Sequence, residues 1–332
     1  MPDAPPGTPV GMLSEETILE RILARLGSAD VLVGPGDDAA VVGLADSRVV
    51  VTTDTLIHGP DFRLAWSSGV DLGAKAAAVN LADVAAMGAR PVALFVALAM
   101  PPDTAIGFVE DLAAGLRSAC DELAPGCRVA GGDLASSDTL TVAVTAIGEL
   151  EPGQRPVLRS GARPGDIVAV CGDLGVAAAG LDLLFDRFRD PRGEAVAVDS
   201  SQLTAAEQHA VARQLRPHPP ISAGPAAARA GATAMMDVSD GLVRDARRLA
   251  RASGVTVDLE RARLGRDSVR ALRGGEDHAL LATFPPDVAL PTGFRRIGSI
   301  VPSGAAPLTV DGDVELAPGG WDPYRDWDGA SG

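Results

Sequence analysis

The spacing of apolar residues near the start of the chain predicts an amphipathic helix. Within residues 14–26 the side chains of Ile18, Ile22 and Leu26 recur at helical intervals and fall on one face. A later stretch, residues 70–87, is apolar almost all round, which is typical of a helix that is buried on every side. The pattern therefore predicts one surface helix, followed by a second helix in the core.

Apolar runs of strand length alternate with helical patterns through the rest of the chain. They predict strands over 48–53, 92–100, 127–130, 140–147, 167–171, 233–236 and 255–259, helices near 104–123, 175–185, 204–215 and 242–251, and a loop-rich tail from 302. This alternation is typical of the α/β or α+β class. Residues 150–160 are rich in Pro, Gly and charge, so we expect two domains, 1–150 and 151–332.

Composition and charge narrow the class of protein. The 332 residues are 46% hydrophobic, and the formal net charge of −15 opposes binding to nucleic acid or to anionic membranes. Residues 1–11 lack the apolar segment of a signal peptide, and the longest apolar run, 92–100, is too short to span a membrane. The three cysteines are too sparse to suggest disulfides or a zinc site. We therefore expect a soluble, cytoplasmic protein.

Lys75 is the only lysine in the chain. It stands in the alanine-rich stretch that is predicted to be a buried helix. A P-loop would place its lysine after a glycine-rich run, and a protein kinase would place it on a strand. If the protein binds a nucleotide, it must hold the phosphates by other means.

Acidic residues recur at the ends of the apolar strands. They occur in GDD (Asp37, Asp38), TTD (Thr52, Thr53, Asp54), GGD (Asp133) and DVSD (Asp237, Ser239, Asp240). Asp83 lies inside the buried helix, three residues after Asn80 and on the same face. A buried carboxylate is unfavourable unless it is paired or bound to metal, and no arginine stands beside these acids in the sequence. The pattern thus favours metal as their partner.

Magnesium suits oxygen ligands of this kind. It is commonly held by one or two carboxylates together with water and substrate phosphates, so several such ions could join an acidic protein to an acidic nucleotide. Each segment alone also has a structural interpretation: GDD and TTD as turns, and the Ser-Asp of VSDG as a helix N-cap. Asp83 is harder to explain in this way because its burial must be compensated.

Taken together, these segments resemble those of the thiamine-monophosphate kinase family. The matching stretches, which span nearly the whole chain, are GPGDDAAVV (34–42), VTTDTL (51–56), NLADVAAMGA (80–89), GGDLASSDTLTVAVTAIG (131–148), RSGARPGD (159–166), DVSDGLVRD (237–245) and GGEDHALL (274–281). A looser relationship joins this family to aminoimidazole-ribotide synthetase, selenophosphate synthetase and a hydrogenase-maturation protein. The segments NLADVAAMGA, DVSDGL and GGED together favour the thiamine branch.

The resemblance implies a two-domain fold like that of aminoimidazole-ribotide synthetase. An N-terminal mixed-sheet domain (1–150) would bind ATP and magnesium and form a homodimer, and a C-terminal α/β domain (151–332) would complete the nucleotide and substrate site. The implied reaction is the ATP-dependent phosphorylation of thiamine monophosphate to thiamine diphosphate. ATP and thiamine monophosphate would then be the small-molecule partners, with no nucleic acid and no membrane involved.

The resemblance also implies roles for individual residues. The metal ligands would be Asp38, Thr52, Thr53, Asp54, Asp83, Asp133, Asp237 and Asp240. The catalytic residues would be Asp54, Asp133 and Asp240. The nucleotide contacts would be Gly132, Asp133, Arg159 and Ser239, and the contacts to thiamine phosphate would be Asp61, Glu276 and Trp321.

The segments that would contact the acceptor depart from the family pattern. Asp61 occupies a position that is often His in the family, and His58 lies three residues earlier. In GGEDHAL, His278 and Ala279 replace the Tyr and Glu of the family. The metal segments are intact, whereas the details of acceptor binding are open. We expect His58 to be a solvated loop residue rather than a ligand.

These segments contain no obvious general base. A phosphate monoester is largely ionised at pH 7, so its oxygen can attack without one, and we expect an in-line transfer assisted by several magnesium ions. Two alternatives remain. One is another ATP-using member of the superfamily, such as aminoimidazole-ribotide synthetase, and the other is a non-catalytic protein that binds magnesium and nucleotide.

Overall fold

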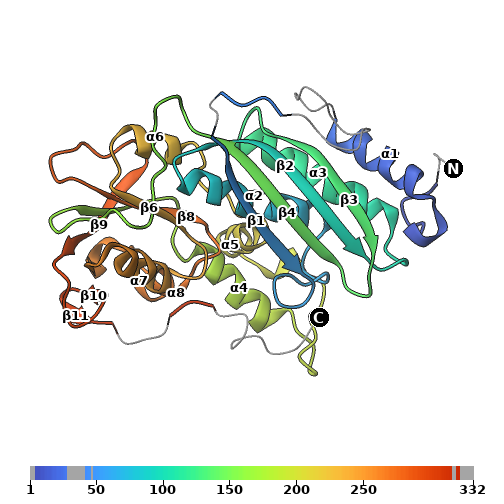
Figure 1. Ribbon diagram of the computed structural model, residues 1–332. Coiled ribbons are helices and arrows are strands. Elements are labelled where there is room, and N and C mark those ends of the chain that lie inside the picture. The colour runs from blue at the N-terminus through green and yellow to red at the C-terminus, as the bar shows by residue number, and fades with distance from the viewer. Residues whose placement is uncertain (1–3, 28–41, 46–47, 316–318, 322–332) are drawn as a thin grey trace.

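The computed structural model describes residues 4–27, 42–45, 48–315 and 319–321. The chain forms two mixed sheets, one from its first half and one from its second, with helices packed between and around them (Figure 1). The predicted mixed α/β class is confirmed. Among the residues described, no helix combines the length and the apolar character needed to cross a bilayer.

The first sheet has four strands in the order β1-β4-β2-β3. Its strands are β1 (Val50–Ile57), β2 (Arg90–Met100), β3 (Arg128–Ser136) and β4 (Thr141–Glu149). β4 pairs antiparallel with β1 and β2, whereas β3 runs parallel to β2. The helices of this half are η1 (Val10–Met12), α1 (Glu15–Leu26), α2 (Gly69–Ala86) and α3 (Ile106–Leu123). α2 and α3 cover one face of the sheet, and α1 packs against α3 (Figure 1).

The other face of the first sheet is partly open. Side chains along β1 alternate between the two faces, as a strand requires. Those of Thr52 and Leu56 point toward the helices, whereas those of Val51, Thr53 and Thr55 point the opposite way and are exposed. The exposed fraction of Val51 is 56%, which leaves a β-branched apolar side chain on a sheet surface in water.

The second sheet has seven strands in the order β11-β10-β7-β9-β5-β8-β6. Its strands are β5 (Ile167–Cys171), β6 (Ala234–Val238), β7 (Thr256–Leu259), β8 (Ala279–Phe284), β9 (Phe294–Val301), β10 (Leu308–Val310) and β11 (Asp313–Val314). Only the β7–β10 pair is parallel among those described. The helices of this half are α4 (Val176–Arg187), η2 (Ser200–Gln202), α5 (Ala205–Leu215), α6 (Ala223–Arg229), α7 (Leu242–Ser253), η3 (Arg261–Arg263) and α8 (Ser268–Arg273).

α2 joins the two halves. It contacts β1, β2 and β4 of the first sheet and also β6, β8, α5 and α6 of the second half. Where α2 crosses α3, the backbones touch through glycines. A Cβ atom on Gly73 would lie 2.0 Å from the carbonyl oxygen of Leu112, and one on Gly115 would lie 2.2 Å from that of Val70. Only glycine permits so close an approach.

Gly73→Ala should therefore destabilise the protein by about 2 kcal/mol, because the added methyl group forces the two backbones apart. Thermal unfolding followed by circular dichroism measures the change. Gly7→Ala is the control, because a Cβ atom on Gly7 meets no atom within 4 Å and the midpoint should not move. Equal midpoints for the two variants would show that α2 and α3 can separate at little cost.

Several elements differ from those predicted from the apolar pattern. The GGD segment lies inside β3, which continues to Ser136, instead of following the strand. The tail from 302, predicted to be loop, contains β10 and β11, which are too short to show a period. α6, α8, β8 and β9 were not predicted. All six residues of β8 are buried, so the strand shows no alternation of apolar and polar residues.

Candidate functional site

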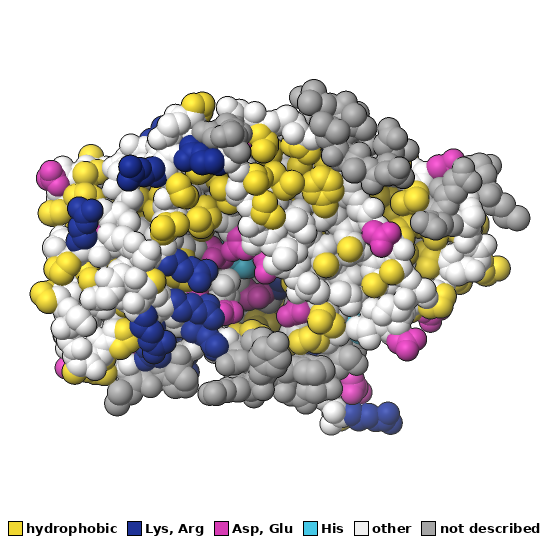
Figure 2. All heavy atoms as spheres, in the orientation of Figure 1, with side chains coloured by type: hydrophobic (Ala, Val, Ile, Leu, Met, Phe, Trp, Pro, Cys, Tyr) yellow, Lys and Arg dark blue, Asp and Glu magenta, His cyan; other side chains and the backbone are white. Residues whose placement is uncertain are grey.

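A cavity of about 410 Å³ opens between the two halves. Its walls come from β1 and the loop after it, from α2, α4 and α5, and from the loops after β6 and before β8. Figure 2 shows a hollow with carboxylates and a histidine at its base and basic side chains along one rim. The predicted site residues that line it are Asp54, Asp61, Asp83, Asp237, Ser239, Asp240, Glu276 and Trp321.

Four carboxylates gather at one end of this cavity. They come from β1, α2, β6 and the loop after β6: Asp54, Asp83, Asp237 and Asp240. Thr52 Oγ1 donates a hydrogen bond to Asp83 Oδ2 at 2.7 Å, and the backbone N–H of Asp54 donates one to Asn80 Oδ1 at 3.2 Å. Asn80 and Asp83 thus share a face of α2, as their spacing predicts, and this face contacts β1.

The carboxylates disfavour one another's charge. Burial, and after it repulsion from Asp237, raises the pKa of Asp83 to about 7, despite the hydrogen bond from Thr52. The same two causes raise the pKa of Asp54. At neutral pH this end of the cavity therefore holds negative charge that the surrounding protein compensates poorly, and a bound cation would stabilise it.

Asp240 is a partial exception because it has an arginine partner. Arg248 Nη1 lies 2.6 Å from Asp240 Oδ2 and 2.7 Å from Oδ1 of Asp245. No arginine stands beside these acids in the sequence, but the fold brings one to Asp240, so metal is not its only available partner. Arg248 stands eight residues later, on α7, so the pair is not visible as neighbours in the sequence.

Asp245 holds the loop that carries Asp240. Its side chain is fully buried, and its Oδ2 accepts hydrogen bonds from the backbone N–H groups of Asp240 at 3.0 Å and Gly241 at 3.2 Å. Burial raises the pKa of Asp245 to about 6, against the opposing effect of Arg248. Asp245 was not predicted to have a role, although the matching segment DVSDGLVRD ends on it.

His278 lies beside the acid cluster. The sequence marks it only as a departure from the family pattern. It is buried and lines the cavity, and its Nδ1 lies 3.2 Å from Asp237 Oδ2. Burial lowers the pKa of His278, but the contact with Asp237 outweighs burial and leaves the pKa raised. The backbone of His278 is left-handed, with φ at 52°, which is uncommon for a residue with a side chain.

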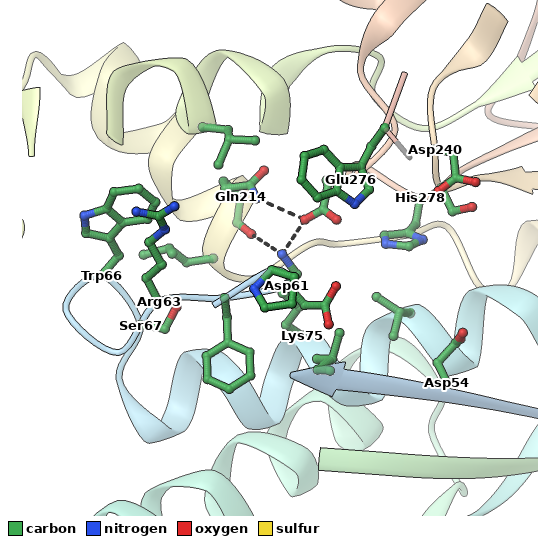
Figure 3. A pocket seen from close by; sticks show the side chains of 18 of the residues that line it. Asp54, Asp61, Arg63, Trp66, Ser67, Lys75, Gln214, Asp240, Glu276 and His278 are labelled. Atoms are coloured by element: carbon green, nitrogen blue, oxygen red, sulfur yellow. Dashed lines mark hydrogen bonds and ion pairs between the residues drawn. The ribbon is translucent and has the colours of Figure 1, made fainter. Parts of the chain in front are cut away.

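The other end of the cavity is built around Glu276. Its Oε2 accepts hydrogen bonds from Lys75 Nζ and, at 3.0 Å, from Gln214 Nε2 (Figure 3). Burial raises the pKa of Glu276, but the charges of Lys75 and His278 outweigh it and leave the pKa lowered. Asp61 Oδ2 accepts a hydrogen bond from the backbone N–H of Ile57 at 2.8 Å, and burial raises the pKa of Asp61.

Aromatic and aliphatic side chains complete this end. They are Phe62, Trp66, Leu181, Leu184, Phe185 and Leu215. The guanidinium of Arg63 lies over two of the rings, 5.1 Å from the centroid of Trp66 and 4.8 Å from that of Phe185. We expected His58 to be solvated; it is partly exposed, and its ring also packs against Phe62 with the centroids 5.6 Å apart.

The C-terminal segment returns to the cavity at Trp321. Its backbone N–H donates a hydrogen bond to the carbonyl of Asp240 at 2.8 Å, and its carbonyl accepts one from Arg244 Nη1 at 2.8 Å. The backbone of Trp321 is thus anchored to the loop that carries Asp240, while the residue itself lines the cavity.

Two predicted site residues lie far in space from the cavity of their own chain. Gly132 and Asp133 are exposed on β3, at the far edge of the first sheet. Across β2 and β4, Asp133 is in register with Thr55 of β1. Three strand spacings, about 14 Å, separate them. Asp133 therefore cannot share one ion with Asp54 of the same chain, because both oxygens would have to lie about 2 Å from the metal.

Of the other predicted residues that the structure describes, Thr52, Thr53 and Arg159 do not line the cavity either. Thr53 points to the other face of β1, where its Oγ1 donates a hydrogen bond to the carbonyl of Val144 at 3.0 Å. Arg159 stands on a loop whose backbone is held by Ser253 Oγ, 2.8 Å from the Arg159 carbonyl. Asp38, like Asp37, lies outside the described residues.

The acid end fits divalent cations whose coordination is completed by phosphate oxygens. In the part of the chain that the structure describes, no three His, Cys, Asp or Glu side chains form a metal-binding group by themselves. Mg²⁺ does not require one, because it takes one or two carboxylates together with water and phosphate. Burial first, and repulsion from Asp237 second, raise the pKa of Asp54 and of Asp83, and bound cations would favour the charged form of both carboxylates.

Known proteins resemble this chain over most of its length. Residues 36–150 match the family model for AIR synthase related protein, N-terminal domain. The chain is 41% identical to the thiamine-monophosphate kinase of Mycobacterium tuberculosis over 332 residues, which cover 95% of this chain and 93% of the relative.

Solved structures show the same likeness. The thiamine-monophosphate kinase of Stenotrophomonas maltophilia K279a has a TM-score of 0.72 and 34% identity, covering 91% of this chain and 98% of that chain. The structure of AaThiL complexed with AMPPCP and TMP has a TM-score of 0.71 and 33% identity, covering 93% of this chain and 97% of that chain.

Proposed function

Because the chain belongs to the thiamine-monophosphate kinase family, we propose that it transfers the γ-phosphoryl group of ATP to thiamine monophosphate, giving ADP and thiamine diphosphate. The observation that carries this proposal is one cavity with two unlike ends. An acid cluster suited to cations and phosphates lies at one end, Glu276 and Asp61 line the cavity beyond it, and Trp321 also lines the cavity. The AaThiL structure, complexed with AMPPCP and TMP, supports the same pair of ligands.

Several Mg²⁺ ions would be held at the acid end. The ligands predicted from the sequence are Asp38, Thr52, Thr53, Asp54, Asp83, Asp133, Asp237 and Asp240. Within one chain the side chain of Thr53 points to the other face of β1 and Asp133 lies at the far edge of the sheet, so Asp133 would reach the ions only from a second copy. When bound, the ions would neutralise the phosphates of donor and acceptor and hold them in line. Asp54, Asp83, Asp237 and Asp240 support this proposal through their shared position in the cavity.

The side chains of the protein bind and orient the two phosphate-bearing molecules. The acceptor phosphate is largely ionised at pH 7. An acceptor oxygen can therefore form its bond to the γ-phosphorus while the bond to the ADP oxygen breaks, and no general base is needed. We assign the nucleotide to Gly132, Asp133, Arg159 and Ser239, and catalysis to Asp54, Asp133 and Asp240. Ser239 lines the cavity between Asp237 and Asp240 in the chain.

The acceptor end suits a positively charged heterocycle. Thiamine contains a thiazolium ring, which a carboxylate attracts and an aromatic face can stack against. The side chain of Glu276 is 37% exposed, so it can be reached from the cavity. We propose that Glu276 and Trp321 bind the acceptor and that Asp61 replaces the histidine found in many family members.

Trp321→Ala should raise KM for thiamine monophosphate about 2- to 30-fold and leave kcat nearly unchanged, because it removes a ring contact of about 0.5–2 kcal/mol. Steady-state kinetics with the acceptor varied measures the effect. Trp321→Phe is the matched control, since it keeps an aromatic face. The anchoring hydrogen bonds of Trp321 come from its backbone and persist in both variants. An unchanged KM in Trp321→Ala would reject the stacking role.

We further propose that the protein is a homodimer formed through its N-terminal half (1–150). β1 and β3 are the two edges of the first sheet, and one face of that sheet exposes Val51 and Thr55. Open edges and exposed apolar strands usually acquire a partner. A second copy would also explain Asp133, which is too far from Asp54 of its own chain. A mass in solution twice that of the chain supports this proposal, and a monomer contradicts it.

The reaction is tested by incubating the pure protein with Mg²⁺, ATP and thiamine monophosphate. We expect thiamine diphosphate and ADP in equal amounts, detected by mass. ATP binding without ADP release, whatever the acceptor, would indicate a nucleotide-binding protein instead. Ring closure of an aminoimidazole precursor would indicate a synthetase. A cytoplasmic location follows from these two substrates and stays a prediction, testable by fractionation.

A further inference from the structure

We propose that Lys75 is a positioning residue that fixes the orientation of Glu276 from across the interface between the two halves. This inference rests on the proposed function of the cavity, because it concerns how the acceptor carboxylate is held. Lys75 is the only lysine in the chain, and it does not occupy the position that a P-loop or a protein kinase requires for its phosphate-binding lysine. The contacts of its ammonium group account for that position.

The ammonium group of Lys75 reaches from one half to the other. Lys75 lies on α2, whereas Gln214 lies in the last turn of α5 and Glu276 precedes β8. Lys75 Nζ donates hydrogen bonds to Glu276 Oε2 and, at 3.5 Å, to the carbonyl oxygen of Gln214. Only 6% of the Lys75 side chain is exposed, against 37% for Glu276. The lysine is therefore buried behind the carboxylate, and the carboxylate faces the cavity.

Gln214 holds the same oxygen from a second direction. A carboxylate oxygen can only accept, so the Gln214 atom 3.0 Å from Glu276 Oε2 must be its amide nitrogen. Oε2 thus receives two hydrogen bonds and cannot rotate freely, while the other oxygen points away from Lys75 and Gln214 (Figure 3). One oxygen of fixed direction remains for the acceptor. Fixing a binding group before the ligand arrives reduces the entropy lost on binding.

A nearby ion pair provides a control that distinguishes the orientation of Glu276 from the attachment of the two halves to each other. Arg216 pairs with Asp71, which precedes Lys75 by one turn of α2, so this pair also joins α2 to the end of α5. Arg216 is 52% exposed and does not contact Glu276 among the described contacts. Arg216→Met therefore removes a tie between the halves without changing the support of the carboxylate, and it is the matched control.

The kinetic test compares KM for the two substrates. Lys75→Met should raise KM for thiamine monophosphate about 10-fold, the usual effect of losing a hydrogen bond to a charged group, and keep KM for ATP within about twofold. Lys75→Arg should recover part of the loss. Arg216→Met should change neither constant. In a Glu276→Gln background, Lys75→Met should add little, because both changes act through one contact.

A spectroscopic test does not depend on turnover. Because the chain has one lysine, lysine labelled with ¹³C at the ε-carbon gives a single side-chain NMR signal. Glu276→Gln should shift this signal, whereas Arg216→Met should not. Thiamine monophosphate should also shift it in the wild-type protein, because the ligand engages the other oxygen of Glu276.

The outcomes separate the two proposals. A wild-type protein that forms no thiamine diphosphate overturns the proposed function, and the response of the lysine signal to Glu276→Gln still tests whether Lys75 holds Glu276. Three results overturn the positioning role: a lysine signal unmoved by Glu276→Gln, an equal rise of both KM values in Lys75→Met, or the same rise of the acceptor KM in Arg216→Met.

Discussion

Asp54→Asn lowers kcat by about 100-fold or more while the protein stays folded. Loss of one carboxylate weakens cation binding, and cations of this kind contribute several kcal/mol of transition-state stabilisation, with each tenfold corresponding to about 1.4 kcal/mol. Folding is not expected to suffer. The pKa of Asp54 is raised by burial and by its acidic neighbours, so its charge is unfavourable in the folded protein, and a neutral isostere removes that repulsion.

Turnover and thermal midpoint must be measured on the same preparations. Asp240→Asn should behave like Asp54→Asn in turnover. Asp138→Asn is the control, because Asp138 is exposed in the turn between β3 and β4 and lies outside the cavity. Near-normal kcat in both cavity variants would reject the assignment of these carboxylates to the metals. A large fall in midpoint would instead show that they support the fold.

Asp245→Ala should cost about 3 kcal/mol of unfolding free energy and also reduce turnover. The change leaves the part-buried backbone N–H of Asp240 and the buried one of Gly241 without an acceptor, at about 1–3 kcal/mol for a buried group. It also removes a partner of Arg248. Denaturant unfolding gives the free energy, and kcat reports the displacement of Asp240.

Asp182→Ala is the matched control for Asp245→Ala. Asp182 is also a helical aspartate paired with an arginine, at 2.8 Å from Arg270, but its side chain is 62% exposed. An exposed ion pair contributes about 0–1 kcal/mol, so this variant should be nearly neutral. If both variants lost the same stability, burial and the two backbone hydrogen bonds would not be the cause.

The acid end of the site could be predicted because its signals are local. Asp54 directly follows a predicted strand, which the structure extends through it to Ile57, Asp237 and Asp240 lie at the end of another strand, and Asn80 and Asp83 share a helix face by simple periodicity. Each of these statements needs only a few neighbouring residues. The segments meet because α2 contacts both β1 and β6, which is a property of the topology.

The long-range partners could not be predicted in this way. Lys75 and Glu276 are separated by 201 positions, and Asp237 and His278 by 41. No period or cap joins such positions, and their pairing depends on how the two sheets pack around α2. For Asp133 the motif could be recognised in the sequence, but its position in the fold could not. Its motif is visible, but the glycines before it conceal that β3 continues through it as an edge strand.

Local signals also explain which helices and strands could be predicted from the sequence. α2 was predicted over 70–87 and spans Gly69–Ala86, because it is apolar on every side and has a capping box at Ser68. β8 was missed and shows no alternation, although β6, which is equally buried at every position, was predicted from its short apolar run. The strands of the tail were missed because two or three residues carry no period.

The central claim is that the carboxylates of the cavity hold nucleotide phosphates through divalent ions. Calorimetric titration with AMPPCP, with and without Mg²⁺, tests it most directly. We predict that the affinity for AMPPCP falls at least about tenfold when Mg²⁺ is removed, because carboxylates and phosphates then repel each other. We also predict that Asp54→Asn weakens the binding of AMPPCP when Mg²⁺ is present. Equal affinity for AMPPCP with and without Mg²⁺ would contradict the claim.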